Sequence, residues 1–322
     1  MLHDNDGRWL AAAARLAEHG RPLSLPNPAV GAVLVKDDKV LGHGWTQPGG
    51  RPHAEAAALE QAGDGAKSAT LYVTLEPCAH HSGRGPNCAQ LLVDAGVRRV
   101  VYAMLDPDPR TAGRGIIRLQ AAGIAAEQLP CAAAEAGLAG YVARHKRGRP
   151  FVTLKLAMSL DGQIALPDGQ SQWITGSPAR AHVHAQRARQ DVILVGGKSW
   201  RHDRPRLDVR LPGLENRSPR RMVLTREEGP DGIAVLREPE AIFAMEEQYL
   251  YIEGGAETAA AFLRADLVDR LDLYRAPILV GAGRSAVGDL GITELARTHG
   301  LWRQVERRQL GSDLYEAYER TL

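Results

Sequence analysis

Four side chains near the N-terminal end of the chain are of types that bind and use a metal ion. His53 and Glu55 stand two residues apart at the start of the alanine-rich stretch "RPHAEAAALEQAG". Cys78 and Cys88 follow in "EPCAHHSGRGPNC". One imidazole and two thiolates are the donor set of a catalytic zinc ion that keeps a fourth position open for water. We therefore expect His53, Cys78 and Cys88 to bind one Zn²⁺ per chain.

Glu55 is not needed as a ligand in such a site, and it suits the role of general base and acid. A carboxylate beside an open zinc site can take a proton from water and return it to a leaving group. Simpler interpretations stay open, because His-x-Glu alone also begins many helices. His80 or His81 could supply a fourth ligand and make the site structural, and Cys131 fits a small core residue.

The elements around these residues predict how they would meet. Apolar spacing predicts helices over 8–20, from His53 onward, and over "NCAQLLVDAGV", "GIIRLQAAGI" and the longer "CAAAEAGLAGYVARHKR". "ATLYVTLEPC" and "RRVVYAML" fit buried strands, and a hairpin should turn at Asp37-Asp38. Cys88 would open a helix, whose N-terminal dipole lowers the pKa of a thiol. Alternating strands and helices predict a layered α/β domain.

The basic segment from Arg144 to Phe151 interrupts this pattern, so we expect two domains, 1–148 and 149–322. In the second, "FVTLKLAMSLDGQIA" fits a strand that leads into a turn, and Ser177 should cap the helix "SPARAHVHAQRARQ". Gly254 and Gly255 end the segment "QYLYIEGG", which begins as a buried strand. Such glycines let backbone approach a ligand, and the helix start after them favours a cofactor pyrophosphate. A plain tight turn is the alternative.

Composition excludes several classes of protein. The chain has 322 residues, of which 44% are apolar and 24% charged, as in folded domains. A net charge of +2 is too small to indicate a basic surface that binds nucleic acid. No apolar run approaches the ~18 residues of a membrane span, and acids occupy the N-terminal flank where a signal peptide is basic. With three cysteines and no disulfide framework, we expect a cytoplasmic protein with no membrane or nucleic-acid partner.

Several motifs together resemble known families. "HAE", "TLEPCAHH" and Cys88 are similar to the cytidine/deoxycytidylate deaminases, whose signature joins His-x-Glu to Pro-Cys. "PNPAVGAVLV", "GGRPHAEAAAL" and "DPDPRTAGRGI" resemble the N-terminal half of the bifunctional riboflavin-biosynthesis deaminase/reductases. "SLDG", "SQWITG", "VGGKSW", "DRPRLDVR" and "EGG" follow in the order of the reductase half. The resemblance implies a cytidine-deaminase-like three-layer α/β/α domain and a dihydrofolate-reductase-like α/β domain.

The same resemblance implies two activities on a small-molecule substrate. The first domain would use zinc to deaminate 2,5-diamino-6-(5-phosphoribosylamino)pyrimidin-4(3H)-one. The second would use NADPH to reduce the ribosyl group, which gives 5-amino-6-(5-phosphoribitylamino)uracil. We also expect a homo-oligomer.

Site residues carried over from the family form two groups. Those expected to contact NADPH are Ala157, Trp173, Ser199, Asp203, Arg226, Gly255, Ala256, Glu257 and Thr258. Those expected to contact substrate are Asn27 in the deaminase, and Lys155, Ser171, Arg187, Leu207, Arg210 and Glu253 in the reductase. Arg187 and Arg210 could grip a ribose phosphate bidentately. Arg226 could meet the 2′-phosphate that distinguishes NADPH from NADH.

The chain departs from the family at several positions. Nine residues separate Cys78 from Cys88, where the family usually has eight, and we expect the loop to absorb the extra one. Ser199 stands where the family has threonine, and the segment after Thr225 is short. Three other interpretations stay open: a tRNA or other nucleic-acid deaminase with an appended domain, a zinc-stabilised scaffold or sensor, and a chain with one active half.

Overall fold

The computed structural model describes every residue except 1–2, 4, 81–84 and 322. The chain folds into two compact units, Met1–Gly148 and Arg149–Leu322. His81, one of the alternative metal ligands, lies outside the described residues.

The first unit is built on a five-stranded sheet with the strand order β2-β1-β3-β4-β5. Its strands are β1 (Gly31–Lys36), β2 (Lys39–Trp45), β3 (Thr70–Val73), β4 (Arg99–Tyr102) and β5 (Ala125–Gln128). The pairs β1–β2 and β1–β3 are antiparallel, whereas β3, β4 and β5 run parallel. The carboxyl ends of these three strands therefore meet at one edge of the sheet.

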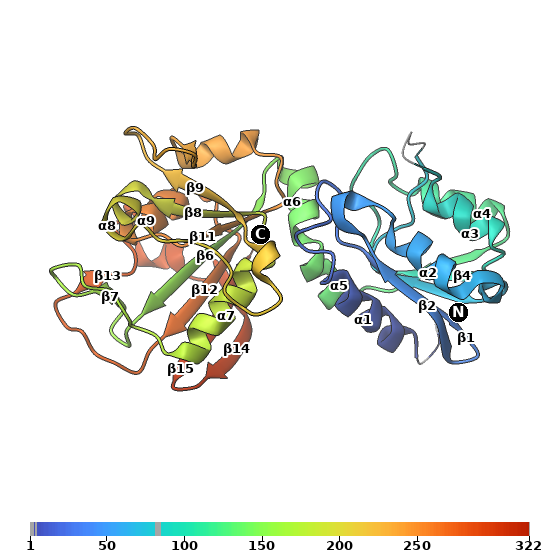
Figure 1. Cartoon of the computed structure of the whole chain (residues 1–322), viewed down its shortest axis with the longest axis horizontal. Coiled ribbons are helices and arrows are strands. Elements are labelled where there is room, and N and C mark those ends of the chain that lie inside the picture. The colour runs from blue at the N-terminus through green and yellow to red at the C-terminus, as the bar shows by residue number, and fades with distance from the viewer. Residues whose placement is uncertain (1–2, 4, 81–84, 322) are drawn as a thin grey trace. The chain divides into compact units, whose positions relative to one another are not determined.

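Helices cover both faces of this sheet (Figure 1). They are α1 (Asp6–Ala17), α2 (Ala54–Ala62), α3 (Cys88–Asp94), α4 (Arg114–Ala121), α5 (Ala132–Gly137) and α6 (Ala139–Arg147). In β1, Leu34 packs with the α2–α4 side and Val33 with the α1–α5 side, because successive strand residues point to opposite faces. The unit is thus the expected three-layer α/β/α fold.

The sequence predictions for this unit were right in most elements and wrong in two. The hairpin turns at Asp37-Asp38, which both have positive φ (50° and 60°). The longer helix is in fact α5 and α6, interrupted at Leu138 (φ −99°, ψ 3°), and Cys131 precedes α5 as its N-cap. Strand β5 was not predicted, because its half-exposed "AAEQ" has no apolar alternation.

The second unit is built on an eight-stranded sheet, β10-β9-β8-β11-β6-β12-β15-β14. Its strands are β6 (Phe151–Met158), β8 (Val192–Gly196), β9 (Arg220–Leu224), β10 (Ala234–Leu236), β11 (Tyr249–Ile252), β12 (Arg270–Arg275), β14 (Trp302–Leu310) and β15 (Asp313–Arg320). The strands from β10 to β12 run parallel, and the β14–β15 hairpin joins β12 in antiparallel pairing. A separate two-stranded sheet pairs β7 (Gln163–Ala165) with β13 (Arg284–Ser285).

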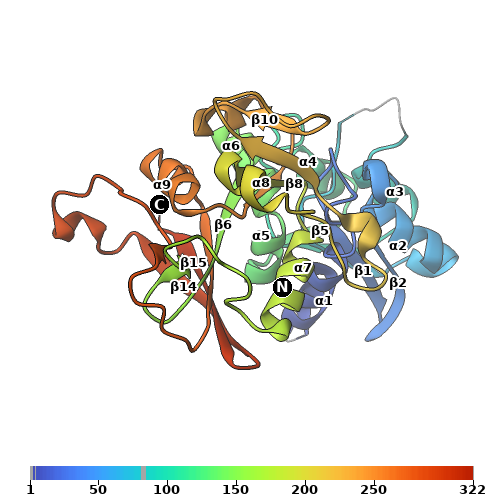
Figure 2. The ribbon, with the colours of Figure 1, turned by 60° about the vertical axis from the view of Figure 1, so that its left-hand side comes forward.

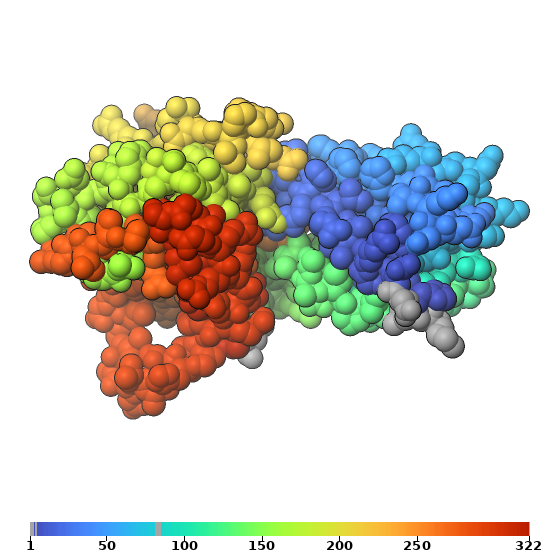
Figure 3. All heavy atoms as spheres, turned by 90° about the horizontal axis from the view of Figure 1, so that it is seen from below, coloured from blue at the N-terminus to red at the C-terminus, as the bar shows by residue number. Residues whose placement is uncertain are grey.

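Helices again lie on both faces of the larger sheet. They are α7 (Ser177–Arg187), α8 (Gly197–Asp203) and α9 (Ala256–Arg264). Phe262 of α9 packs on Leu154 and Leu194, while Val183 of α7 packs on Tyr274 and Tyr315 at the opposite face. The segment that carries the short 3₁₀ helix Leu295–Thr298 stands away from the sheet (Figures 2 and 3).

The helix cap predicted at Ser177 is wrong. Gly176 is the N-cap of α7, and the backbone N–H of Gly176 donates to Asp313 Oδ2 at 2.7 Å. The C-terminal hairpin was also missed, because "WRQVERRQL" is mostly exposed and polar. In the described part of the chain, no helix has both the length and the hydropathy that crossing a membrane requires.

Candidate active site

His53, Cys78 and Cys88 meet at the carboxyl edge of the first sheet. His53 is the N-cap of α2, Cys78 lies beyond the end of β3, and Cys88 is the first residue of α3. His53 Nδ1 lies 3.2 Å from Cys88 Sγ and 3.6 Å from Cys78 Sγ. Asn27 lies on the other side of the imidazole, where its Nδ2 is 3.0 Å from His53 Nε2 and donates to the Gly50 carbonyl at 2.9 Å.

This cluster has the dimensions of a zinc site. All three donor atoms lie within 4.8 Å of one another. Among the described residues, this is the one group of His, Cys, Asp or Glu side chains that could hold a metal ion. Donors at ordinary zinc–nitrogen and zinc–sulfur distances on a tetrahedral ion are about 3.5–3.8 Å apart. The ninth loop residue therefore does not keep Cys88 from the other donors. His80 lies outside this cluster, and its Nδ1 is 3.2 Å from Thr111 Oγ1.

The pKa values of the two thiols in this cluster are shifted in opposite directions. A hydrogen bond from Cys88 holds the pKa of Cys78 well below its ordinary value, and the same bond together with burial raises the pKa of Cys88. The pKa of His53 is raised: burial, the largest single effect, lowers it, but the hydrogen bond to Cys78 and the negative charges of Glu55 and Cys78 together outweigh burial. A cationic ion would favour the deprotonated thiols that it binds.

Glu55 lies in the first turn of α2, beside the cluster but outside the donor set. The side chain lines the pocket although the residue is only 3% exposed. Burial in a low-dielectric environment raises the pKa of its carboxyl group. Because burial favours its neutral form, this carboxyl group is suited to donate a proton as well as to accept one, as a general acid and base must.

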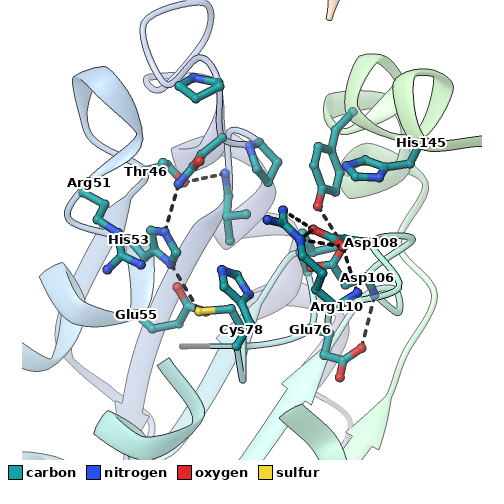
Figure 4. A pocket seen from close by; sticks show the side chains of 17 residues that line it. Thr46, Arg51, His53, Glu55, Glu76, Cys78, Asp106, Asp108, Arg110 and His145 are labelled. Atoms are coloured by element: carbon teal, nitrogen blue, oxygen red, sulfur yellow. Dashed lines mark hydrogen bonds and ion pairs between the residues drawn. The ribbon is translucent and has the colours of Figure 1, made fainter. Parts of the chain in front are cut away.

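A cavity of about 380 Å³ opens over these residues. In Figure 4, His53, Glu55 and Arg51 form one wall, and Asp106, Asp108 and Arg110 lie across from them. Tyr141 and His145 of α6 also line it, and the Tyr141 hydroxyl donates to Asp106 Oδ1 at 2.9 Å. Sequence reasoning assigned no role to this second wall, although it quoted "DPDPRTAGRGI" as a family motif. Nothing in the sequence around Tyr141 and His145 marks them as residues that line a pocket.

Glu76 is a further residue that sequence reasoning missed. It is 2% exposed, and its two oxygens accept backbone N–H groups of Gly113 and Gly115 at 2.9 Å each. A Cβ on Gly115 would lie 2.0 Å from the Pro77 carbonyl, so only glycine allows this approach. Glu76 therefore fixes the start of α4 against the segment that carries Cys78. A carboxylate three residues after a buried strand was the available signal.

In the second unit, Ser199, Arg226 and the Gly255–Thr258 segment, all expected to contact cofactor, lie near the carboxyl ends of β8, β9 and β11. A Cβ on Gly255 would lie 3.6 Å from Ser199 Oγ, so α8 and the N-terminus of α9 are adjacent. Gly255 is the N-cap of α9 and provides no side-chain cap, which leaves backbone N–H groups of the first turn for an anion. Arg226 is exposed directly after β9, and Asp203 is exposed at the end of α8.

The glycines at this edge also have a packing role. A Cβ on Gly196 would lie 2.2 Å from Thr258 Oγ1, and one on Gly254 would lie 2.6 Å from Thr258 Cβ. Thr258, expected to contact cofactor, is buried between them, and Glu257 is exposed and paired with Lys198 at 2.7 Å. These two positions therefore need glycine for packing against Thr258.

Three residues expected to contact substrate form one buried ion-pair network. Glu253 accepts from Arg187 Nε at 2.6 Å and from Arg187 Nη2 at 3.0 Å, and Lys155 Nζ lies 3.6 Å from Glu253 Oε2. Burial alone would raise the pKa of Glu253, but Arg187 and Lys155 lower it to about 2. Lys155 is therefore not a surface lysine.

The network changes what is expected of Arg187. Its third nitrogen, Nη1, donates to the Asp208 carbonyl at 2.9 Å, so protein acceptors already occupy the groups that a bidentate phosphate grip needs. Arg210 is exposed and makes one ion pair, Nε to Asp208 Oδ1 at 3.4 Å.

The remaining predicted residues lie apart from this network. The Leu207 side chain is buried among Ile193, Val195 and Tyr251, so only its backbone can face a ligand. Ala157 is partly buried on β6, where it packs on the α7 side of the sheet. Ser171 is half-buried, and Trp173 is 65% exposed with the Arg180 guanidinium 4.7 Å from its ring centre.

Comparison with known proteins matches both units. Residues 3–104 match the cytidine and deoxycytidylate deaminase zinc-binding region, and residues 150–249 and 240–315 match the RibD C-terminal domain. The riboflavin biosynthesis protein RibD of Escherichia coli K12 is 37% identical over 96% of this chain and 98% of its own length. That of Aquifex aeolicus is 34% identical over 99% and 100%.

Solved structures agree over the whole chain. RibD of Acinetobacter baumannii (form 1) has a TM-score of 0.88 at 35% identity and covers 99% of both chains. The deaminase/reductase of Thermotoga maritima has a TM-score of 0.87 at 27% identity, over 98% of this chain and 99% of its own. With its zinc-binding deaminase domain and its reductase domain, the chain belongs to the RibD family of bifunctional riboflavin-biosynthesis enzymes.

Proposed function

We propose that the first unit removes the 2-amino group of 2,5-diamino-6-(5-phosphoribosylamino)pyrimidin-4(3H)-one, with Glu55 as the proton carrier. The observation that carries this proposal is the position of Glu55, buried beside three zinc-type donors that do not include it. His53, Cys78 and Cys88 would hold the ion, and bound Zn²⁺ would activate water as a Lewis acid.

The residues of the chain would do the remaining work of the deamination. Glu55 accepts a proton on its carboxylate and passes it to the departing amine, which leaves as ammonia. Asn27 is fixed beside His53 by the Gly50 carbonyl, a position that suits a hydrogen bond to the pyrimidine.

The second unit would then reduce the ribosyl group of the deaminated product. We assign NADPH, which supplies the hydride when bound, to the edge formed by Ser199, Asp203, Arg226 and the Gly255–Thr258 segment. Ala157 and Trp173 are assigned to the same cofactor. Arg226 is exposed at this edge, which supports a contact with the 2′-phosphate and a preference for NADPH over NADH.

The substrate of the reductase would lie over the Lys155–Glu253–Arg187 network. Glu253 holds Arg187 and Lys155 in place, which leaves Lys155 to face the reacting sugar. Ser171, Arg210 and the Leu207 backbone are assigned to the same substrate. Arg210 is the exposed arginine here, so we assign the phosphate to it rather than to Arg187.

A homo-oligomer is proposed from the exposed apolar residues of the second unit. Leu279, Ile292 and Leu295 are 77%, 54% and 76% exposed on segments outside the large sheet. Large apolar side chains with this exposure would be stabilised by burial against another copy of the chain. The alternative of a nucleic-acid deaminase with an appended domain is not favoured, because full-length relatives are RibD proteins.

The test is to give the zinc-loaded protein the diaminopyrimidine and NADPH while following ammonia release and NADPH absorbance. We expect one ammonia released and one NADPH oxidised per substrate. Arg210→Ala should slow the second step and let the deaminated intermediate accumulate, whereas Arg307→Ala, at an exposed position on β14, should not. Ammonia release without NADPH oxidation in the unaltered protein would leave only the first half active and contradict the proposal.

A further inference from the structure

We propose that a basic groove next to the deaminase pocket binds the phosphate group of the deaminase substrate. The polar residues of this groove are His80, Arg110, Arg114 and Arg118, and we call it the arginine groove. The inference rests on the proposed function, because it identifies where one part of that substrate binds.

The arginine groove adjoins the pocket over Glu55. It has a volume of about 550 Å³, and His80 and Arg110 line both it and the 380 Å³ pocket. In Figure 4, Arg110 lies on the wall opposite His53 and Glu55. A pyrimidine bound at Glu55 can therefore extend its phosphoribosyl chain past His80 and Arg110 into the groove.

The charge of the groove suits a phosphate monoester. Arg110 donates from Nε to both oxygens of Asp108, at 3.0 and 2.8 Å, so one of the three guanidinium charges is neutralised. The Arg118 side chain donates to Gln90 Oε1, a neutral acceptor. Arg114 is exposed, and its guanidinium has no partner among the described residues. About two positive charges remain, and a phosphate monoester carries about −1.5 to −2 at neutral pH.

The position of the arginines is fixed relative to the metal ligands. Arg114 and Arg118 are four residues apart on α4, so they project from the same face of the helix. Glu76 fixes the start of α4 through the N–H groups of Gly113 and Gly115, on the segment that leads directly to Cys78. The fold therefore fixes the distance from the metal cluster to Arg114. A fixed distance is needed if the pyrimidine of one substrate molecule binds at the metal while its phosphate binds at Arg114.

The experiment compares Arg114→Ala with the unaltered protein on two substrates, the phosphorylated diaminopyrimidine and its dephosphorylated counterpart. For the phosphorylated substrate we expect KM to rise about tenfold to a hundredfold, the effect of losing a charge-assisted hydrogen bond, with kcat unchanged. For the dephosphorylated substrate, Arg114→Ala and the unaltered protein should have the same KM. Arg98→Ala, at an exposed arginine between α3 and β4, is the matched control and should match the unaltered protein on both.

An equal rise in KM on both substrates, or no rise on either, would overturn the proposal. A binding measurement separates this from failure of the proposed reaction. Ribose 5-phosphate is titrated calorimetrically into Arg210→Ala protein with and without Arg114→Ala, because Arg210→Ala removes the phosphate contact assigned to the reductase. Weaker binding in the double variant supports the arginine groove even if no ammonia is released, and unchanged binding contradicts it.

Discussion

Two buried glutamates, one in each unit, have opposite electrostatic environments. Glu55 is buried beside sulfur and imidazole donors, and burial raises the pKa of its carboxyl group. Glu253 is also buried, which alone would raise its pKa, but Arg187 and Lys155 lower it to about 2. Glu55 is therefore suited to gaining and losing a proton, whereas Glu253 stays ionised and holds two cations in place.

The comparison extends to how each site is built. The metal cluster needs three donor atoms within a few ångströms, so a few residue types at strand and helix ends suffice. The reductase site is spread over the ends of β8, β9 and β11, with side chains held by a network of ion pairs. The metal centre thus depends on three donor atoms, while the cofactor edge depends on glycine backbone packed against Thr258 and on side chains from several strand ends.

The largest effect is expected from Cys88→Ser. It removes one of the three donors and should abolish tight zinc binding and deamination as completely as Cys78→Ser does. The reason is that the cluster has no spare ligand among the described residues. Metal analysis of the two purified variants checks this. Stoichiometric zinc in Cys88→Ser alone would mean that another residue is the ligand.

Glu55→Gln should separate proton transfer from metal binding. Deamination should fall by ~10²–10⁴-fold or more, while zinc content stays intact, because the amide cannot accept the proton. Given the deaminated pyrimidine directly, the variant should still oxidise NADPH. Loss of both activities with zinc and fold intact would mean that the two units share one site.

Glu253→Ala should instead destabilise the second unit. It leaves Arg187 and Lys155, 11% and 17% exposed, without their shared counter-ion. Leaving a buried charge unpaired costs ~3–5 kcal/mol. Hydrogen exchange of the β6 and β11 amides under urea measures the loss. Glu227→Ala, which breaks the exposed pair with Arg201, is the control and should cost at most ~1 kcal/mol. Equal effects would show that the Glu253 network is not stabilising.

The smallest expected effect is a dependence of stability on pH that belongs to Glu253. Its pKa is about 2 in the folded chain and 4.5 ordinarily, so folding favours the ionised form. This contribution is fully present above pH 4.5 and decreases as the pH falls towards 2, by about 3 kcal/mol in all. Between pH 5 and 3.5, the second unit should lose more stability in the unaltered protein than in Glu253→Gln. Parallel losses would contradict the assigned pKa.

Much of the fold was predictable because hydrophobic periodicity is local. The hairpin at Asp37-Asp38, the α/β layering and the buried strands follow from alternation and turn residues. Strands β5 and β14 were not predictable, because their exposed polar residues give no period, whereas β15 was missed although its Tyr315 and Ala317 alternate as buried residues. The break at Leu138 was hidden in an alanine-rich stretch that suits one helix as well as two.

The sequence alone determined the donor types and the general base, since His53, Glu55, Cys78 and Cys88 are chemically distinctive whatever surrounds them. Only the tertiary structure decided what each of the other groups is free to do. It bonded the guanidinium of Arg187 to Glu253 and Asp208, and it set Glu76 under the start of α4. It also placed Arg110 and Arg114 along one groove. The physical reason is that residue type fixes which bonds a group can make, while long-range packing decides which partners reach it first.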